Sequence, residues 1–299
     1  MKKLIFGCIV TVFVLAACSN DTASEPAAGT DDTDRLNASE QLAALVGEYY
    51  DRNLELNPLS ATQVGDDRFD DQLANRYGPQ YIAATEAMDQ EFLQRLAEID
   101  ASGFEGQDWL TYEAFKLSRE SAIAGQQFPQ ELQPVNQFFS VPNFFVRLGS
   151  GAAFHPFNTV KNYDDFLSRI DDYIVLNNQM IENMKLGMQQ DIVQPRILME
   201  KVIPQLASQV VENVEDSSFY LPIKNMPDEF SDEDRERLTA AYTEAIREKI
   251  IPAYQRLGNF ISDEYLGAAR ESVGLSELPN GEAWYAHMVK LRTTTDLTP

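Results

Sequence analysis

An apolar stripe with helical spacing is the feature that most constrains the fold of this chain. One clear example runs through Phe166, Ile170, Ile174, Ile181, Met184 and Met188. This spacing places the apolar side chains on one side of an α-helix, which must then pack against other helices. Other stripes predict further helices within 42–49, 82–96, 109–117, 195–213, 238–266 and 281–292, of which the longest starts at Ser231. The sequence therefore predicts a mainly α domain of antiparallel helices.

Capping residues and prolines predict where some of these helices begin or bend. Gly78-Pro79 begins the second helix, because proline fits the first turn of a helix. Asn162 can cap the helix that contains the stripe from Phe166 to Met188, and Ser231 can cap the helix that contains the stripe at 238–266. Pro252 is expected to kink that later helix.

Two apolar runs, 138–147 and 219–223, have the composition of β-strands, but prolines interrupt both. They lie within the segments 127–160 and 214–230, which are predicted to be long loops. No internal repeat of roughly 20 to 50 residues is evident, so a solenoid is not predicted.

The first eighteen residues have the pattern of a bacterial lipoprotein signal peptide. Lys2 and Lys3 precede an uncharged, mostly apolar stretch at 4–17, which ends in Leu15-Ala16-Ala17-Cys18. A helix of this length rises about 21 Å, which is short of the ~30 Å of a hydrocarbon core. The stretch is therefore interpreted as a signal peptide and not as a membrane span.

Cys18 is the predicted lipidation site, and its acyl groups make the membrane a predicted partner, because two or three acyl chains anchor a protein firmly. Ser19 follows the cysteine, which favours an outer-membrane lipoprotein that faces the periplasm. Cys8 leaves with the signal peptide, so the mature chain keeps no free thiol. An ordinary signal peptide that contains a cysteine by chance is the alternative.

The predicted divisions of the chain are a signal peptide at 1–18, a flexible tether at 19–36 and a helical domain at 37–299. The tether is polar, small and acidic, which is typical of a segment that does not fold. About 260 residues remain, which are enough for one large domain with a sizeable core.

The chain is strongly acidic, with 47 Asp and Glu residues against 24 Lys and Arg residues. Nucleic acid is therefore excluded as a partner, because phosphate binding needs a basic surface. The acidic residues are spread along the chain, which indicates solvated helix faces.

Residues that carry chemistry are scarce. The two histidines, His155 and His287, do not form the H-E-x-x-H pattern that binds zinc on one helix face. Gly149-Ser150-Gly151 lacks the spacing of a hydrolase nucleophile, and no glycine-rich phosphate loop is present. The sequence therefore predicts no catalytic residue, no metal ligand and no cofactor within this chain.

The segment nearest the C-terminus holds the most varied side chains. It offers aromatic rings, an imidazole, a guanidinium and a hydroxyl, which together can line a polar cleft. The predicted cleft-lining residues are Trp284, Tyr285, His287, Arg292 and Thr294. A helix with a capping turn and no binding role is the alternative interpretation of this segment.

Several segments, taken in order, resemble the bacterial lipoprotein family called domain of unknown function 885. The matching segments are 148–151, 156–167, 193–195, 199–204, 219–224, 278–285 and 293–299. The resemblance implies a mainly helical fold about twice as long as this chain, similar to zinc metallopeptidases of the H-E-x-x-H type. It also implies that zinc belongs to the C-terminal half of the longer family members.

Two hypotheses follow. In the first, the chain is the N-terminal half of a lipid-anchored, metallopeptidase-like protein and lacks the zinc site. The end of the chain at Thr298-Pro299 fits this expectation, because Thr-Pro is a helix start. In the second, it is a stand-alone helical lipoprotein that binds a peptide or a partner protein.

Overall fold

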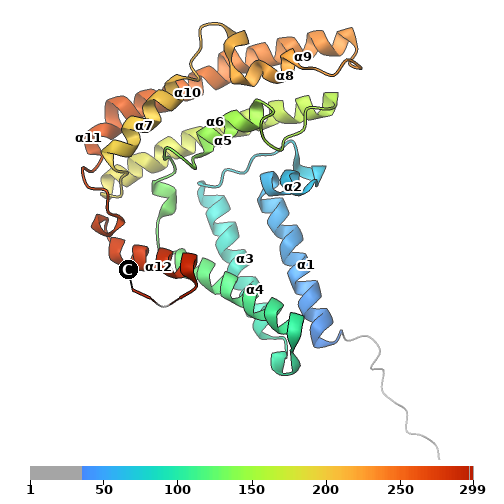
Figure 1. Cartoon of the computed structure of the whole chain (residues 1–299), viewed down its shortest axis with the longest axis vertical. Helices are drawn as coiled ribbons and strands as arrows, with labels where there is room; N and C mark the ends of the chain where they lie inside the picture. The colour runs from blue at the N-terminus through green and yellow to red at the C-terminus, as the bar shows by residue number, and fades with distance from the viewer. Residues whose placement is uncertain (1–35, 296, 299) are drawn as a thin grey trace, which may run out of the picture. The chain divides into compact units, whose positions relative to one another are not determined.

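The structure is a computed structural model that describes residues 36–295, 297 and 298, and within them it is mainly α-helical and without a β-strand (Figure 1). The predicted fold class is confirmed at this level. The helices are α1 (Ala38–Leu56), α2 (Pro58–Val64), α3 (Pro79–Ala97), α4 (Gly106–Gly125), α5 (Val141–Gly149), α6 (Val160–Gln189), α7 (Arg196–Ala207), α8 (Leu221–Lys224), α9 (Asp232–Ala245), α10 (Ile251–Phe260), α11 (Leu266–Ala268) and α12 (Gly281–Thr293).

The helices of Ala38–Pro299 form two packed groups. Helices α1, α3 and α4 pack against one another, and we call them the three-helix group. Their core is small and consists of Leu42, Leu45, Met88, Phe92, Leu96 and Ile99. Helix α6 packs against α9 and α10, and α10 packs against α7 (Figure 1). These helices, with α5, surround a larger core that we call the aromatic core.

Stacked rings fill the aromatic core. The Phe145 ring lies parallel to the Tyr173 ring, with their centroids 4.1 Å apart, and it also stacks on Phe166. Buried tyrosine hydroxyls need hydrogen-bond partners, and here several find backbone carbonyls on distant segments. Hydroxyls donate from Tyr163 to Pro222, from Tyr242 to Tyr163 and from Tyr254 to Pro142. The rings and their hydroxyls thus fix the helices against one another.

Four apolar residues, Trp109, Tyr112, Phe115 and Leu117, predict helix α4, and only part of this stripe is covered. Tyr112 and Phe115 pack against the core of the three-helix group, whereas Trp109 and Leu117 are exposed. The buried residue of α4 is Arg119, which pairs with Asp89 on α3. An ion pair therefore sets the rotation of α4, and the apolar stripe alone does not.

The predicted start of α6 is displaced by three residues. Thr159 is the N-cap, and its hydroxyl accepts a hydrogen bond from the Asn162 backbone N–H at 3.2 Å. The Asn162 side chain accepts one from the Thr159 backbone N–H at 3.1 Å. Asn162 is therefore the second partner of a capping box and not the cap itself.

The predicted loops and β-like runs contain helices. Helix α5 covers most of 138–147, and α8 covers most of 219–223. In both, the proline that interrupts the run occupies the first turn of the helix, where no backbone donor is needed.

The helix predicted at 195–213 ends earlier, at Ala207. The π-helical turn Ile246–Ile250 is followed directly by α10, whose first turn contains Pro252, so the helical path continues from α9 into α10.

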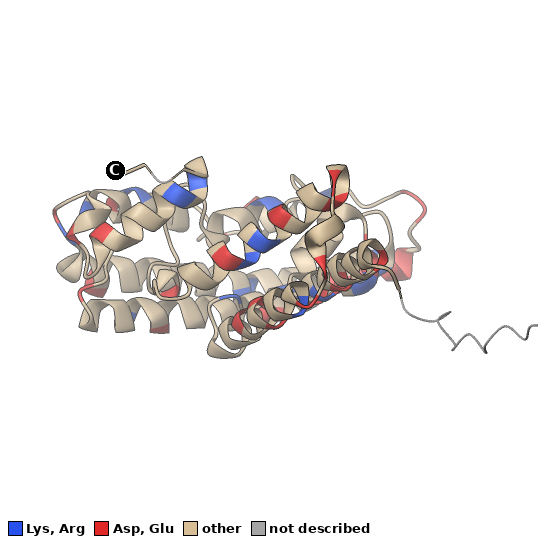
Figure 2. Cartoon of the chain, turned by 90° about the horizontal axis from the view of Figure 1, so that it is seen from below, with Lys and Arg blue, Asp and Glu red and all other residues tan. Residues whose placement is uncertain are grey.

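The predicted signal peptide at 1–18, its Cys18 and almost the whole tether at 19–36 lie outside the described residues. Among the helices that are described, none is both long and apolar enough to cross a membrane. Acidic and basic residues are interspersed over the helices (Figure 2).

Candidate ligand-binding cleft

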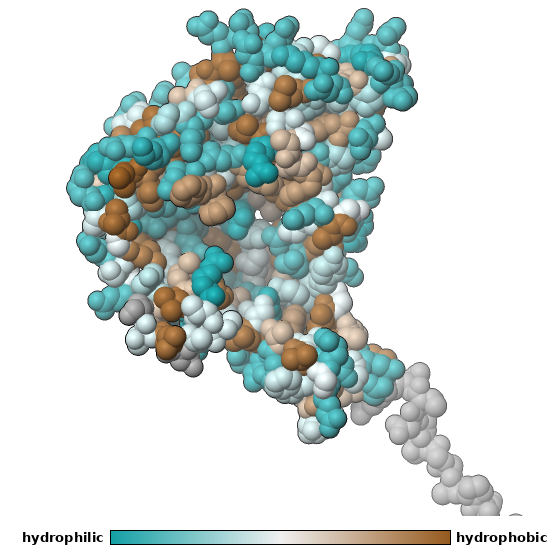
Figure 3. Space-filling view, in the orientation of Figure 1, coloured by the Kyte–Doolittle hydropathy of each residue, from teal (hydrophilic) through white to brown (hydrophobic). Residues whose placement is uncertain are grey.

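A large cleft lies where α3 and α4 face α12 and the short 3₁₀-helix Gln130–Leu132. Its cavity volume is about 1040 Å³, and the molecular surface is visibly hollowed between α12 and α3 (Figure 3). Known small-molecule sites measure roughly 300 to 1,000 Å³. The cleft is therefore large enough for a ligand of several residues.

Three of the five predicted cleft-lining residues lie in the wall of this cleft. Trp284, His287 and Thr294 line it, from α12 and its C-cap. Tyr285 and Arg292 are exposed and are absent from its wall. A role in binding stays a prediction for all five residues.

Aromatic stacking fixes α12 at the edge of the cleft. The Trp284 ring stacks on Phe128, with centroids 5.7 Å apart, and the His287 ring lies 5.2 Å from the same phenylalanine. Gly125, at the end of α4, permits this approach, because a Cβ there would lie 3.1 Å from His287 Nε2. Phe128 and Trp284 are buried and His287 is half-buried, so this cluster holds α12 in place and borders the cleft mainly through the His287 ring.

Two amide nitrogens at the cleft lack partners. Gln126 and Gln133 line the wall, and the Nε2 atom of each is buried without a hydrogen-bond partner among the described residues. An unpaired buried donor costs about 1–3 kcal/mol. A carbonyl oxygen of a ligand would pair each donor after rotation of the side chain.

Carboxyl groups also line the cleft, from Glu86, Asp89 and Glu131. Burial raises the pKa of Glu131, and the nearby Glu86 carboxylate raises it further. Burial likewise raises the pKa of Asp89, and the Arg119 guanidinium partly offsets this. Arg76, Arg119 and Lys290 line the same wall, so its acidic and basic side chains are equal in number, and Asp89 pairs with Arg119.

Arg119 joins all three helices of the three-helix group. Its guanidinium donates to the Asp89 carboxylate on α3 and to the Tyr49 hydroxyl on α1. It also lies over the Tyr49 ring, 4.1 Å from the centroid, which is a favourable cation–π position. Its Nε is buried and has no hydrogen-bond partner in the described part of the chain.

A second cavity, of about 520 Å³, adjoins the cleft, since Arg76 and Phe139 line both. We call it the phenylalanine groove, because its wall includes Phe138, Phe139, Phe144, Phe145 and Phe154. Phe138 and Phe139 precede α5 and are 72% and 93% exposed. Aromatic rings this open to solvent are typical of binding surfaces.

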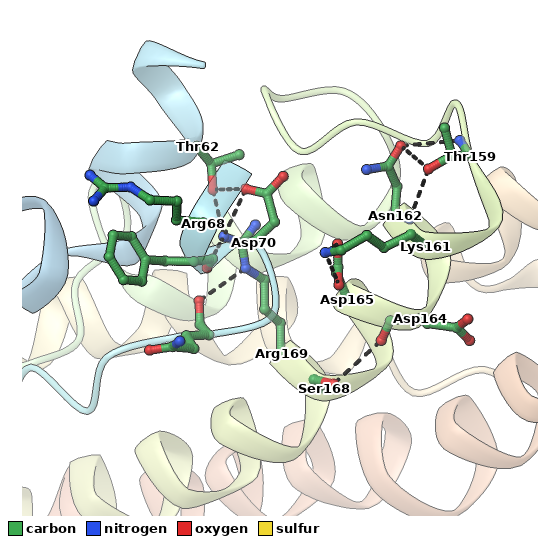
Figure 4. Close-up of polar contacts among 12 residues, drawn as sticks. Thr62, Arg68, Asp70, Thr159, Lys161, Asn162, Asp164, Asp165, Ser168 and Arg169 are labelled. Carbon is green, nitrogen blue, oxygen red and sulfur yellow. Dashed lines mark hydrogen bonds and ion pairs between the residues drawn. The ribbon is translucent and has the colours of Figure 1, made fainter. Parts of the chain in front are cut away.

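The walls of the groove come partly from residues 57–76, and Arg169 on α6 holds that segment in place (Figure 4). Arg169 is fully buried. It donates to the Thr62 hydroxyl at 2.5 Å and to the backbone carbonyls of Phe69 and Gln72. Asp70 lies 3.7 Å away and completes the charge balance. Burial lowers the pKa of Arg169 to about 10, so it stays protonated at neutral pH.

His155 completes this network from the loop before α6. Its Nδ1 accepts from Arg169 at 2.7 Å, and its Nε2 donates to the Asn162 carbonyl at 2.9 Å. Burial, and to a smaller extent the Arg169 charge, lowers the pKa of His155 to about 4, although the hydrogen bond to the Asn162 carbonyl partly opposes this. The ring is therefore neutral, and its tautomer is set by its two partners.

The described residues do not fit a zinc site. No group of three or more His, Cys, Asp or Glu side chains lies close enough there to hold a metal ion. Both nitrogens of His155 are already engaged, and His287 stacks on Phe128.

Sequence reasoning missed Arg119, Arg169 and the pair Phe138–Phe139. Arg119 follows Phe115 by four residues and Arg169 follows Phe166 by three, so each arginine lies on the apolar side of its helix. This position was the sequence signal that they are buried. The two phenylalanines were assigned to a β-like run.

Comparison with known proteins supports these helices as a family fold. A model of the family described as "Bacterial protein of unknown function (DUF885)" matches residues 58–299. A search among curated proteins gave no match. Similar solved structures include the crystal structure of a "putative lipoprotein" from Colwellia psychrerythraea, with 18% identity and a TM-score of 0.74. The match covers 88% of this chain and 47% of that chain, so this chain spans about half the length of that protein. Because the family match extends over most of the sequence, the chain belongs to this family of bacterial proteins of unknown function.

Proposed function

We propose that this chain is part of a lipid-anchored cell-envelope protein and that it binds a peptide in the cleft between α3, α4 and α12. The wall of the cleft carries the proposal: an aromatic edge at Trp284 and His287, and two amide donors, of Gln126 and Gln133, that have no hydrogen-bond partner among the described residues. A peptide presents apolar side chains for the first and backbone carbonyls for the second.

Lipid anchoring is supported by the sequence around Cys18 and by the description quoted above for the Colwellia protein. The test is incorporation of a labelled fatty acid into the chain in bacterial cells. We expect label in the wild-type chain and none in Cys18→Ser, which should also leave the membrane fraction. Equal labelling of both chains would contradict the anchor.

Two tryptophans make peptide binding measurable. Trp109 is exposed and lies outside both cavities, whereas Trp284 lines the cleft. In the full-length chain, Trp109→Phe leaves Trp284 as the only indole. Mixed peptides of four to eight residues should then change its fluorescence saturably, and Trp284→Phe should abolish the response. If calorimetry and fluorescence both detect no binding, the proposal is wrong.

The amide donors provide a matched pair of variants. Gln133→Leu removes an unpaired donor from the cleft, and we expect it to weaken peptide binding. Gln107→Leu makes the same exchange at an exposed position of α4 outside the cleft and should leave binding unchanged. Equal effects of both variants would show that the donors play no part.

We further propose that this chain does not hydrolyse the peptide by itself and that hydrolytic groups, with zinc, belong to the longer family members. The match covers 47% of the Colwellia protein, and this supports the proposal that longer proteins of this fold contain further groups. The full-length chain, incubated with zinc and dialysed, should retain no stoichiometric metal and cleave no peptide in a mixed library. One zinc per chain together with turnover would overturn it.

A further inference from the structure

The phenylalanine groove differs in charge from the rest of this acidic chain. Its wall contains two arginines, Arg76 and Arg147, and no aspartate or glutamate. The whole chain has about two acidic residues for each basic one. A site with this reversed balance favours an anionic ligand.

Both arginines are exposed and have guanidinium donors available to a ligand. Among the described residues, the guanidinium groups of Arg76 and Arg147 form no ion pair and no hydrogen bond, although the Arg76 Cζ lies 5.7 Å from the Tyr77 ring centroid. Arg147 is in the last turn of α5, where a cation is favourable to the helix dipole. That effect does not account for Arg76, which precedes α3 on a separate segment.

The backbone around Arg76 is nevertheless held firmly. The Tyr77 carbonyl accepts from Asn183 on α6 at 2.9 Å, and the Tyr77 hydroxyl donates to the Pro134 carbonyl. The Leu73 backbone N–H donates to Asp172 on α6 at 2.8 Å. The backbone on either side of Arg76 is therefore fixed by hydrogen bonds, whereas the N–H groups of its guanidinium have no hydrogen-bond acceptor among the described residues.

We propose that this groove binds the C-terminal residue of the peptide, with Arg76 and Arg147 pairing the terminal carboxylate. The guanidinium fork matches a carboxylate in geometry. The exposed rings of Phe138 and Phe139 and the partly buried Phe144 and Phe154 would contact a large apolar side chain. The rest of the peptide would continue into the cleft, because Arg76 and Phe139 line both cavities. This inference rests on the proposed peptide binding, and it assigns the orientation of the bound peptide and the site of its C-terminal residue.

The test compares two labelled hexapeptides of one sequence ending in phenylalanine, one with a free carboxylate and one with a C-terminal amide. With the full-length chain, fluorescence anisotropy should show roughly tenfold weaker binding of the amide, as expected for loss of one charge-assisted contact. Arg76→Gln and Arg147→Gln should each weaken binding of the acid peptide and leave the amide peptide unchanged.

Arg247→Gln is the matched control, because Arg247 is exposed and lies outside both cavities. It should change neither affinity, and circular dichroism should confirm that all variants fold. Equal affinity for the two peptides would overturn the carboxylate assignment and leave the proposed peptide binding intact. Binding of neither peptide would overturn both.

A competition experiment separates a peptide terminus from a fatty acid, which also joins a carboxylate to an apolar group. Acetylphenylalanine should displace the acid peptide, and dodecanoate below its micellar concentration should not. Displacement by dodecanoate alone would identify the groove as a fatty-acid site and overturn the inference.

Discussion

Two buried arginines, one beside the aromatic core and one in the three-helix group, are held in contrasting ways. Arg169 is fully buried, and each of its guanidinium nitrogens donates to a hydroxyl, a backbone carbonyl or the neutral His155 ring. Arg119 pairs directly with Asp89, borders the cleft and leaves its Nε unpaired. A fully satisfied network rigidifies a structure. We therefore expect the loss of Arg169 to destabilise the fold more than the loss of Arg119.

The largest expected effect is that of Arg169→Met. It leaves the buried Asp70 carboxylate without its cation, and breaking a buried pair typically costs about 3–5 kcal/mol. The free energy of unfolding from urea denaturation should fall by about that amount. Asp70 keeps the hydrogen bond from Thr62, so the protein should still fold at low temperature. A loss below about 1 kcal/mol would remove the contrast between the two arginines.

The second effect is a loss of stability in acid that depends on His155. Its pKa is about 4 in the folded chain and 6.5 when unperturbed, so the unfolded state binds a proton first as the pH falls. Stability from neutral His155 is therefore complete above pH 6.5 and is lost between pH 6.5 and pH 4, by about 3 kcal/mol in total. Unfolding free energies measured across this range should show the slope, and His155→Asn should flatten it. A slope that persists in the variant would assign the effect to other groups.

Arg119→Met should cost less, about 2 kcal/mol, because the charged group that it leaves without a partner is Asp89, whose pKa is already raised by burial and which can take up a proton. The substitution also removes the hydrogen bond to the Tyr49 hydroxyl. The double variant Asp89→Leu/Arg119→Met should recover most of that loss, since no unpaired charge remains. Hydrogen exchange of α4 amides should rise in the single variant and return in the double one. If Arg119→Met lowers the free energy of unfolding as much as Arg169→Met does, the two arginines contribute equally to stability and the contrast between them is wrong.

The positions of most helices could be predicted because burial of apolar side chains follows the helical period. The stripe from Phe166 to Met184 lies in the aromatic core as predicted. Helices α5 and α8 could not be predicted in the same way. Their prolines would interrupt a strand but are favourable in the first turn of a helix, so the same residue fits two interpretations of the run. Only the packing of the surrounding helices decides between the two.

The candidate site could be predicted only in part. The predicted segment 284–294 places Trp284, His287 and Thr294 at the cleft, because their spacing follows one side of α12. The arginine networks could not be predicted, since their partners are distant in sequence: Arg169 meets Thr62 across 107 positions and Arg119 meets Asp89 across 30. A buried arginine differs from an exposed one only through such partners, which a local pattern does not contain.

The smallest expected effect concerns the exposed ion pair between Arg237 on α9 and Asp164 on α6. Their closest atoms are 2.7 Å apart, but both side chains are more than two-fifths exposed, at 46% and 44%. Exposed pairs contribute roughly 0.2–1 kcal/mol, and salt screens them. Arg237→Gln should therefore lower the free energy of unfolding by less than about 1 kcal/mol, and the difference should shrink further at 1 M salt. A loss as large as that of Arg119→Met would mean that direct pairing, and not burial, decides how much a charge stabilises this fold.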